Sequence, residues 1–402
     1  MKTVGIVVEY NPFHNGHLYQ LQKAKEEARA DIAICVMSGN FLQRGEPALV
    51  SKWSRTKMAL AAGIDLVIEL PFAFSVQKAE IFAYGAVHLL NALNCRYICF
   101  GSESGEIKDF QDSVSFIKKH QFQYEKYIKE FVKTGMSYPS ALSKAYKTLR
   151  PNNEWIDLSK PNNILGFHYM DAAAKINPQL QFITVKRKNA GYHDLSFNET
   201  NIASATSIRN QLYQTGITDV IHEYIPKTSL SELQSYFANF GQLHSWENYW
   251  DYLQYQLLSK SSSELKVIYE VEEGLENRLI RAAQSSKDFQ SFMKTIKTKR
   301  YTWTRLQRTL THILLNVHKE TIRSFGNEPQ YVRLLGMSQS GQKYLSAIKK
   351  DLEIPLISKV SAQQNQMLAL DIKATHIYAH GLAEPYRSKM LDLDYRQPPI
   401  MM

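Results

Sequence analysis

Short β-branched runs alternate with helical stretches over the first hundred residues, and this alternation restricts the possible fold more than any other feature. The expected elements are strands at 3–8, 31–37, 65–70 and 96–100, with helices at 17–30, 51–62 and 79–93. A fifth strand is expected at 181–185. Alternation at this spacing is typical of βαβ units, so we predict an α/β fold with a doubly wound, Rossmann-like parallel sheet. Ligands of such sheets bind beyond the carboxyl ends of the strands.

The character of the chain changes near residue 225. Helical periodicity dominates from residue 229 to about 350, and the strand signals fade. A length of 402 residues also exceeds what one hydrophobic core usually serves. We therefore predict two domains, the α/β domain over 1–225 and a mainly helical domain over 226–402.

Composition narrows the class of protein. Apolar residues make up 44% and no run approaches the roughly 18 needed to span a bilayer, so we expect no membrane segment. The first residues lack the features of a signal peptide, and the three cysteines, Cys35, Cys95 and Cys99, have no disulfide spacing. These features predict a cytoplasmic protein with reduced thiols. The formal charge of +10 favours a polyanionic partner.

The motif Asn11-Pro12-Phe13-His14-Asn15-Gly16-His17 directly follows the first expected strand and opens the first expected helix. A helix N-terminus presents free N–H groups and a partial positive charge, so this position attracts phosphate. His14 and His17 can both donate hydrogen bonds to negative charge that develops on a phosphate. Gly16 would let the backbone approach the nucleotide closely. The motif predicts a phosphate site in which His14 and His17 are catalytic.

A second anion-binding element is expected after the fifth strand, in Ser204-Ala205-Thr206-Ser207-Ile208-Arg209. Taken alone, hydroxyl groups at a helix start are an ordinary N-cap, although they also bind anions. Arg209 can hold the β- and γ-phosphates with its planar guanidinium. In this order, the two elements resemble the HxGH nucleotidyltransferase superfamily, which includes class I aminoacyl-tRNA synthetases and adenylyltransferases. Ala205 departs from the pattern, because many members carry a second hydroxyl there.

Five longer strings resemble one family more closely, the bacterial tRNA(Met) cytidine acetate ligases. The strings are VEYNPFHNGH at 8–17, MSGNFLQRGEPA at 37–48, FGSE at 100–103, PNNILG at 161–166 and RLLG at 333–336. The resemblance implies that acetate attacks the α-phosphate of ATP, giving acetyl-adenylate and pyrophosphate. The acetyl group then passes to N4 of the wobble cytidine of elongator tRNA(Met), forming N4-acetylcytidine. It also implies that residues 1–225 bind ATP and residues 226–402 bind tRNA.

The family's pattern also implies which residues bind ATP. They are Val7, Val8, Glu9, Tyr10, Asn11, Pro12, Phe13, His14, Asn15, Gly16, His17, Leu18, Tyr19, Gln20, Gly101, Asn162, Asn163 and Arg187, beside Ser204, Thr206 and Arg209. Structural alternatives stay open for three positions. Gly101 could be a strand-end turn, Asn162 and Asn163 a helix cap, and Arg187 a surface residue.

The loop after the second expected strand carries Arg44 and Glu46. Arg44 could pair with a substrate carboxylate, with RNA phosphate, or with Glu46, and the sequence leaves these alternatives open. Mg²⁺ is expected with ATP because phosphates usually carry it. We see no cluster of acidic ligands, so we predict no dedicated metal site.

Residues 287–308 are strongly basic, with Asp288 as their single acid. The basic residues are Lys287, Lys294, Lys297, Lys299, Arg300, Arg305 and Arg308. Tyr301 and Trp303 lie among them, and aromatic faces can stack on unpaired bases while cations neutralise phosphates. The structural alternative is a solvated helical face with its aromatics in the core. Given the family resemblance, we expect Lys294, Lys297, Lys299, Arg300 and Arg305 to contact tRNA.

Two rival functions share some of these features. A small-molecule adenylyltransferase of cofactor synthesis would have the HxGH motif but would not need a helical domain of about 175 residues. A nucleotide-regulated RNA-binding protein without catalysis would not need both His14 and His17. We therefore favour the ligase, acting on ATP, acetate and tRNA, and we expect no protein partner.

Overall fold

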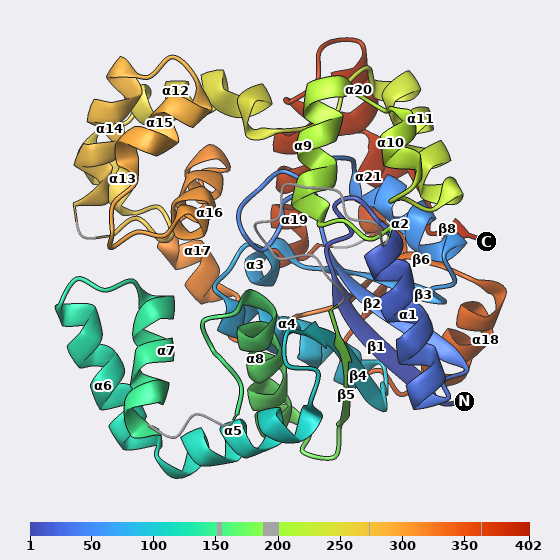
Figure 1. Ribbon diagram of the computed structural model, residues 1–402. Coiled ribbons are helices and arrows are strands. Elements are labelled where there is room, and N and C mark those ends of the chain that lie inside the picture. The colour runs from blue at the N-terminus through green and yellow to red at the C-terminus, as the bar shows by residue number, and fades with distance from the viewer. Residues whose placement is uncertain (151–154, 188–200, 273, 363) are drawn as a thin grey trace.

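The computed structural model describes residues 1–150, 155–187, 201–272, 274–362 and 364–402. Eight strands within these residues form one sheet with the order β5-β4-β1-β2-β3-β6-β7, and β8 pairs with β6 (Figure 1). Strands β1 to β5 are parallel, whereas β6 runs antiparallel to β3. The strands are β1 (Thr3–Val8), β2 (Ile32–Ser38), β3 (Leu66–Leu70), β4 (Tyr97–Ser102), β5 (Gln181–Lys186), β6 (Val332–Met337), β7 (Leu356–Ile357) and β8 (Ile400–Met401).

Helices cover both faces of the sheet, with α4 and α8 on one side and α1 on the other (Figure 1). The helices before residue 218 are α1 (Asn15–Ala28), α2 (Lys52–Ala61), α3 (Phe72–Ser75), α4 (Ala79–Ala92), α5 (Ile107–Lys119), α6 (Gln121–Lys133), α7 (Tyr138–Leu149), α8 (Pro161–Ile176) and α9 (Ala205–Thr215). Those that follow are α10 (Asp219–His222), α11 (Lys227–Phe240), α12 (Trp250–Ser259), α13 (Ser262–Lys266), α14 (Leu275–Ser285), α15 (Phe289–Ile296), α16 (Trp303–Leu314), α17 (Lys319–Ser324), α18 (Gln339–Ile348), α19 (Gln366–Ala379), α20 (Tyr386–Leu391) and α21 (Leu393–Arg396).

The predicted α/β fold is confirmed, and each of the five expected strands is present to within two residues at either end. Strand β2 is buried at every position, and β3 likewise. This burial explains why their sequences are continuous apolar runs, as expected of the centre of a parallel sheet that helices cover on both faces. The carboxyl ends of β1, β2 and β4 therefore meet at one edge, where the predicted motifs lie.

The prediction that residues 229–350 are helical is wrong at Val332–Met337, which form β6. Strands β7 and β8 follow it, so residues from both sides of position 225 build the same sheet. The division into domains at 1–225 and 226–402 stays a prediction. The helices α12 to α17 lie apart from the sheet, above α5 to α7 in Figure 1.

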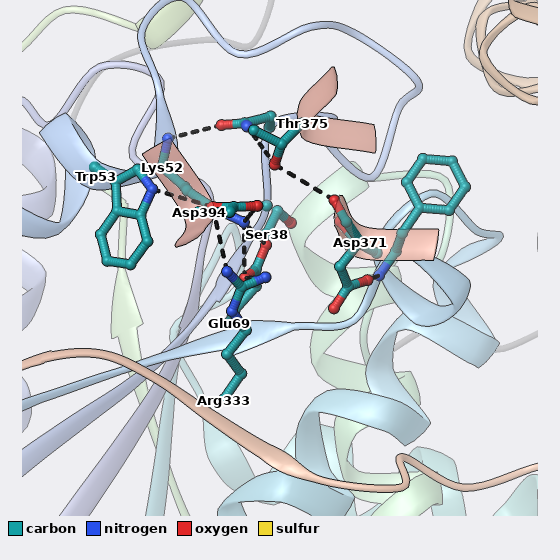
Figure 2. Close-up of polar contacts among 12 residues, drawn as sticks. Ser38, Lys52, Trp53, Glu69, Arg333, Asp371, Thr375 and Asp394 are labelled. Carbon is teal, nitrogen blue, oxygen red and sulfur yellow. Dashed lines mark hydrogen bonds and ion pairs between the residues drawn. The ribbon is translucent and has the colours of Figure 1, made fainter. Parts of the chain in front are cut away.

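Four charged side chains attach β6 and α21 to the first part of the chain (Figure 2), and we call them the buried ionic cluster. They are Lys52 of α2, Glu69 of β3, Arg333 of β6 and Asp394 of α21, and each is at most 3% exposed. Lys52 Nζ lies 2.9 Å from Glu69 Oε1 and 3.0 Å from Asp394 Oδ2. Arg333 lies 2.9 Å from Glu69 and 3.2 Å from Asp394. Each cation thus contacts both anions, which compensates for the loss of water.

No helix within the described part of the chain combines the length and the apolar character required to cross a bilayer.

Candidate functional site

A cleft lies at the carboxyl ends of β1 and β4, where α1 and α9 begin. It brings together residues that are nearly two hundred positions apart in the sequence. Its lining residues are Val7, Val8, Glu9, His14, His17, Gln20, Gln43, Arg44, Glu46, Phe82, Phe100, Gly101, Asn162, Leu165, Tyr169, Arg187, Ser204, Ala205, Thr206 and Arg209. Both histidines and both predicted anion-binding elements therefore face one space, as expected for a ligand site of a doubly wound sheet.

Part of the predicted nucleotide segment lies elsewhere. Tyr10 and Phe13 are buried in the core with their ring centroids 4.6 Å apart. Asn11 is also buried, and its Oδ1 accepts a hydrogen bond from Leu49 N at 2.7 Å. The residues of the segment outside the cleft lining are Tyr10, Asn11, Pro12, Phe13, Asn15, Gly16, Leu18 and Tyr19. The role of these residues in binding ATP stays a prediction.

His14 and His17 have a defined orientation. His14 is the N-cap of α1, and its Nδ1 accepts a hydrogen bond from Gly16 N at 3.0 Å. His17 Nδ1 accepts from His14 N at 3.3 Å, and the two ring centroids are 3.8 Å apart. Because each Nδ1 accepts a backbone N–H, the proton of each neutral ring lies on Nε2. The pair therefore has two Nε2–H donors to offer to a ligand.

Both imidazoles are neutral at physiological pH. Burial, with the nearby charges of Arg187 and Arg209, lowers the pKa of His14 to about 3. Burial likewise lowers the pKa of His17, with His14 and Arg187 as additional causes. Such rings donate one hydrogen bond without carrying a positive charge of their own, so the cationic character of the cleft comes from its arginines.

Gly16 lies directly beside the ring of His14. A Cβ at this position would lie 2.8 Å from His14 Cε1. The space beside Gly16 is thus occupied by the His14 ring, and close approach of the nucleotide to this glycine stays a prediction. Its missing side chain allows the ring of the N-cap residue to fold back onto the helix.

The structure distinguishes Asn162 from Asn163. Asn162 lines the cleft, and its Nδ2 donates to Glu103 Oε1 at 2.7 Å while its Oδ1 lies 3.5 Å from an Arg187 nitrogen. Asn163 is 2% exposed, and its Oδ1 accepts from Glu103 N at 3.0 Å. Asn163 therefore supports the loop after β4, and Asn162 with Arg187 forms part of the wall.

Arg209 reaches across the cleft from α9. It donates to Asn11 O at 2.9 Å and lies 3.3 Å from Glu46 Oε2, forming an ion pair. Ser204 accepts from Ser207 N and caps α9, while Thr206 lines the cleft. Ser204 is thus the N-cap of α9, as the structural alternative proposed, and it also lines the cleft. Arg209 is thus held between the loop after β1 and the loop after β2.

Arg44 and Glu9 complete the charged lining. Burial raises the pKa of Glu9, and the positive charge of Arg44 lowers it in part. Glu9 Oε1 accepts a hydrogen bond from Gln43 N at 2.9 Å, which attaches the 43–46 loop to the end of β1. With Arg187 and Arg209, the cleft contains three guanidinium groups and two carboxylates. Its net charge favours a polyanionic ligand.

The sequence analysis missed the apolar wall formed by Phe82, Phe100, Leu165 and Tyr169. Leu165 and Tyr169 follow Asn162 at intervals of three and four residues in α8. Residues at this spacing share one face of a helix. Once Asn162 is a candidate, helical periodicity alone predicts that Leu165 and Tyr169 also face the cleft. No periodicity of this kind points to Phe82 or Phe100.

The 43–46 loop is packed directly against α16. Gly45 has a φ of +79°, and a Cβ there would lie 2.4 Å from Arg308 N. Thr311 Oγ1 donates to Gly45 O at 2.7 Å. Residues of the predicted tRNA-binding part thus fix a loop of the cleft.

We expect Gly45→Ala to raise the KM for ATP and to lower stability by about 2 kcal/mol, because the methyl group displaces the loop from α16. Thermal unfolding and steady-state kinetics measure the two effects. Gly135→Ala is the matched control, since Gly135 also has positive φ (+85°) but has nothing within 4 Å of its added Cβ. Equal effects of the two substitutions would show that backbone conformation, rather than contact with α16, is what matters.

The predicted basic segment is only partly at the surface. Lys294, Lys297, Lys299 and Arg300 are exposed. Arg305 is partly buried, lies 3.1 Å from Glu272 and has its guanidinium 5.0 Å from the ring centroid of Tyr301.

Two other members of the segment are buried. Arg308 is buried and lies 3.0 Å from Glu270. Tyr301 is buried at 7% exposure, so its face cannot stack on a base, and the core alternative is correct for it.

Among the described residues, no group of three or more His, Cys, Asp or Glu side chains could hold a metal ion. Within the cleft, Glu46 is paired with Arg209, and Glu9 accepts a backbone N–H.

Comparison with known proteins gives consistent matches over the whole chain. A model of the family described as HIGH Nucleotidyl Transferase matches residues 1–392. The tRNA(Met) cytidine acetate ligase of Bacillus licheniformis is 49% identical over 404 residues, covering 100% of this chain and 97% of the relative. That of Lysinibacillus sphaericus is 48% identical with 100% of each chain covered.

Two solved structures are similar in fold. TmcAL of Thermotoga maritima without ligand is 34% identical with a TM-score of 0.92, and 100% of each chain is covered. A second structure of the same protein, bound with alpha-thio ATP, is 33% identical with a TM-score of 0.90, covering 100% of this chain and 99% of the other. The matched chains are as long as this one, so the likeness extends to the sheet, to α5–α7 and to the helices after residue 225.

Proposed function

This chain belongs to the HIGH nucleotidyl transferase family, and from that premise we propose that it is an ATP-dependent ligase that acetylates N4 of the wobble cytidine of elongator tRNA(Met). The observation that carries the proposal is the meeting of two neutral Nε2–H donors and three guanidinium groups in one cleft at the strand ends. Its curated relatives are named for this reaction, and TmcAL was solved with an ATP analogue. We place the reaction in the cytoplasm, where tRNA is found.

In the first step, the carboxylate of acetate attacks the α-phosphorus of ATP, and pyrophosphate leaves. Negative charge grows on the phosphate oxygens as the bond forms, and donors aimed at that charge lower the barrier. We assign this role to Nε2–H of His14 and His17. Arg209 and Arg187 would hold the leaving pyrophosphate, since a guanidinium binds phosphate bidentately. The substrate carboxylate is itself the nucleophile, so the protein needs only to position the reactants.

Acetate requires its own position beside the α-phosphate. Arg44 is the candidate, because its half-buried guanidinium lines the cleft. Its location in the cleft favours a small carboxylate over the RNA backbone as partner.

In the second step, N4 of the cytidine attacks the carbonyl carbon of acetyl-adenylate. AMP leaves, and N4 loses a proton. The apolar wall of Phe82, Leu165 and Tyr169 excludes water from the mixed anhydride, which would otherwise hydrolyse. Mg²⁺ would be held chiefly by the phosphates of ATP, as is usual for this ion.

The test is acetate-dependent exchange of labelled pyrophosphate into ATP, followed by addition of tRNA with labelled acetate. We expect exchange without tRNA and, after tRNA is added, label in N4-acetylcytidine. Exchange that requires a phosphorylated metabolite instead of acetate would support the rival, a small-molecule adenylyltransferase, and would overturn the proposal.

Reversing the charge of Lys294, Lys297 and Lys299 together should weaken tRNA binding at least tenfold at low salt. Each lost phosphate contact should reduce the slope of log K against log salt by about 0.7 to 0.9. Filter binding over a range of salt concentrations measures both. Lys343→Glu on α18 is the control for net charge, and an unchanged salt slope in the triple variant would move the RNA surface elsewhere.

A further inference from the structure

A second cavity, of about 620 Å³, lies on the other side of α8 from the cleft, whose volume is about 210 Å³. Its walls come from α3, α4 and α8 and from Tyr269 and the end of α17. Figure 1 shows α17 above α8 and α4, between the helices after residue 250 and α5–α7. The size is that of sites for a small organic ligand.

The lining of the second cavity combines aromatic surface with hydrogen-bonding groups. Phe74, Tyr84 and Tyr269 supply rings, and Ile81 supplies an apolar floor. His168 is 9% exposed, and its Nδ1 has no hydrogen-bond partner in the protein. A buried polar atom without a partner costs free energy unless a ligand or water satisfies it. Burial lowers the pKa of His168 to about 4, so the ring is neutral and suited to a neutral partner such as a nucleobase edge.

Two acidic groups that line the second cavity are paired with lysines, whereas the exposed Glu328 beside it accepts a hydrogen bond from Tyr84 Oη at 3.4 Å. Asp171 lies 2.7 Å from Lys175, and Glu80 lies 2.8 Å from Lys78. Arg323 at the rim is exposed and adds a further positive charge. Arg323 can therefore bind an anionic group at the opening, and the paired carboxylates suit an uncharged group inside, as in a nucleotide of a polynucleotide.

The second cavity is joined to the cleft through shared elements. Gln43 lines the cleft, and its Nε2 donates to the carbonyl oxygen of Gln77, which lines the second cavity, at 2.6 Å. In α8, Leu165 and Tyr169 face the cleft, whereas His168 and Ala172 face the second cavity. The two spaces are separated by roughly one helix width, about 10 Å. A chain of nucleotides that reaches the cleft is thus long enough to occupy both.

A group of basic helices lies near the second cavity. Helices α5 to α7 (residues 107–149) contain eight lysines and four acidic residues. The ammonium group of Lys78 at the rim lies 5.8 Å from the ring centroid of Tyr138, which opens α7. A lone small nucleotide would not need cationic surface of this extent, whereas an RNA loop would.

We propose that the second cavity binds an unpaired nucleotide of the RNA loop that carries the reactive cytidine, with the base among Tyr84, Tyr269 and His168 and the phosphate at Arg323. This inference rests on the proposed function, since it assigns a second contact to the same RNA. It gives the protein a way to recognise a base other than the one that reacts.

The test uses the anticodon stem-loop of elongator tRNA(Met), with each loop nucleotide next to the reactive cytidine made abasic in turn. Loss of base stacking should raise the KM for RNA about 5- to 100-fold at one position, on the scale seen for stacked bases. The variant Ile81→Trp fills the cavity and should raise the KM for the intact stem-loop to a similar degree. In this variant the abasic substitution should raise the KM for RNA by less than a further twofold.

Arg323→Glu keeps the inference testable if the tryptophan variant does not fold, because Arg323 is at the surface. It should raise the KM for RNA and reduce the salt slope by about one, while Lys343→Glu should change neither. In all variants acetate-dependent pyrophosphate exchange should stay at the wild-type rate.

If Ile81→Trp and the abasic substitution raised the KM for RNA independently, so that their effects multiplied, the inference would be overturned. An unchanged KM for RNA in the variants would also overturn it. Variants that changed only the exchange reaction would assign the cavity to a small molecule and overturn it too. Absence of acetate-dependent exchange in the wild-type protein is a separate result that would reject the proposed function itself.

Discussion

Replacing His14 or His17 by alanine is expected to slow acetate-dependent pyrophosphate exchange by at least about a hundredfold, the scale for losing one donor to a transition-state charge. The reason is the orientation of the rings, because each Nδ1 is engaged by the backbone and only Nε2–H is available to the phosphate. Exchange rates at saturating ATP and acetate measure the effect. A wild-type rate in either variant would reject the catalytic assignment.

Amide side chains separate the donor role from the capping role. His14→Asn can still accept from Gly16 N but has no group at the position of Nε2, so it should keep stability and lose rate. His14→Gln places an amide N–H near that position and should retain more activity than the asparagine variant. The reverse order of rates would mean that His14 acts through the helix cap.

The pH dependence provides a further check on the same residues. Because burial places the pKa of His14 near 3, protonation removes the neutral donor only far below pH 6. The ratio of kcat/KM between wild type and His14→Gln should therefore be constant from pH 8 to pH 6. This ratio cancels the titration of ATP and acetate, and a ratio that fell with a midpoint near 6.5 would show an ordinary, protonatable histidine.

Much of this site could be predicted because its signals are local. The run Thr3–Val8 ends where the His14 motif begins, and a strand followed by a polar turn and a helix has few structural alternatives. Parallel strands then bring the ends of β1 and β4 to the same edge, whatever lies between them. The same reasoning could not separate Asn162 from Asn163, because both open α8 and only the packing of Glu103 decides which one faces the cleft.

Strand β6 could not be predicted for a physical reason. Its sequence, VRLLGM, places an arginine in a short apolar run between helical stretches, and an unpaired charge is not tolerated in a buried strand. Arg333 is tolerated because Glu69 and Asp394 surround it, and these residues are 264 positions before it and 61 after it in the sequence. These partners come close to Arg333 only when the sheet has formed, so the sequence near Arg333 does not indicate them.

Replacing Arg333 by methionine is therefore expected to lower the free energy of unfolding by about 3–5 kcal/mol, the range for removing one partner of a buried ion pair. Glu69 and Asp394 would share only Lys52 as counter-charge, in a space with almost no access to water. Urea unfolding at pH 7 measures the change. The loss should appear throughout the fold, because the cluster joins β6 and α21 to β3 and α2 (Figure 2).

A matched variant distinguishes burial from charge pairing as such. Arg396→Met breaks an exposed pair in which the guanidinium lies 2.7 Å from Asp392, and it should cost no more than about 0.5 kcal/mol. The loss of stability caused by Arg333→Lys should fall between the two. An ammonium group keeps the charge but cannot bind two carboxylates in the way that a planar guanidinium does. If Arg333→Met cost no more than Arg396→Met, the cluster would contribute little to stability. The attachment of residues 332–401 to the sheet would then depend on apolar packing and on the strand pairing of β6 with β3.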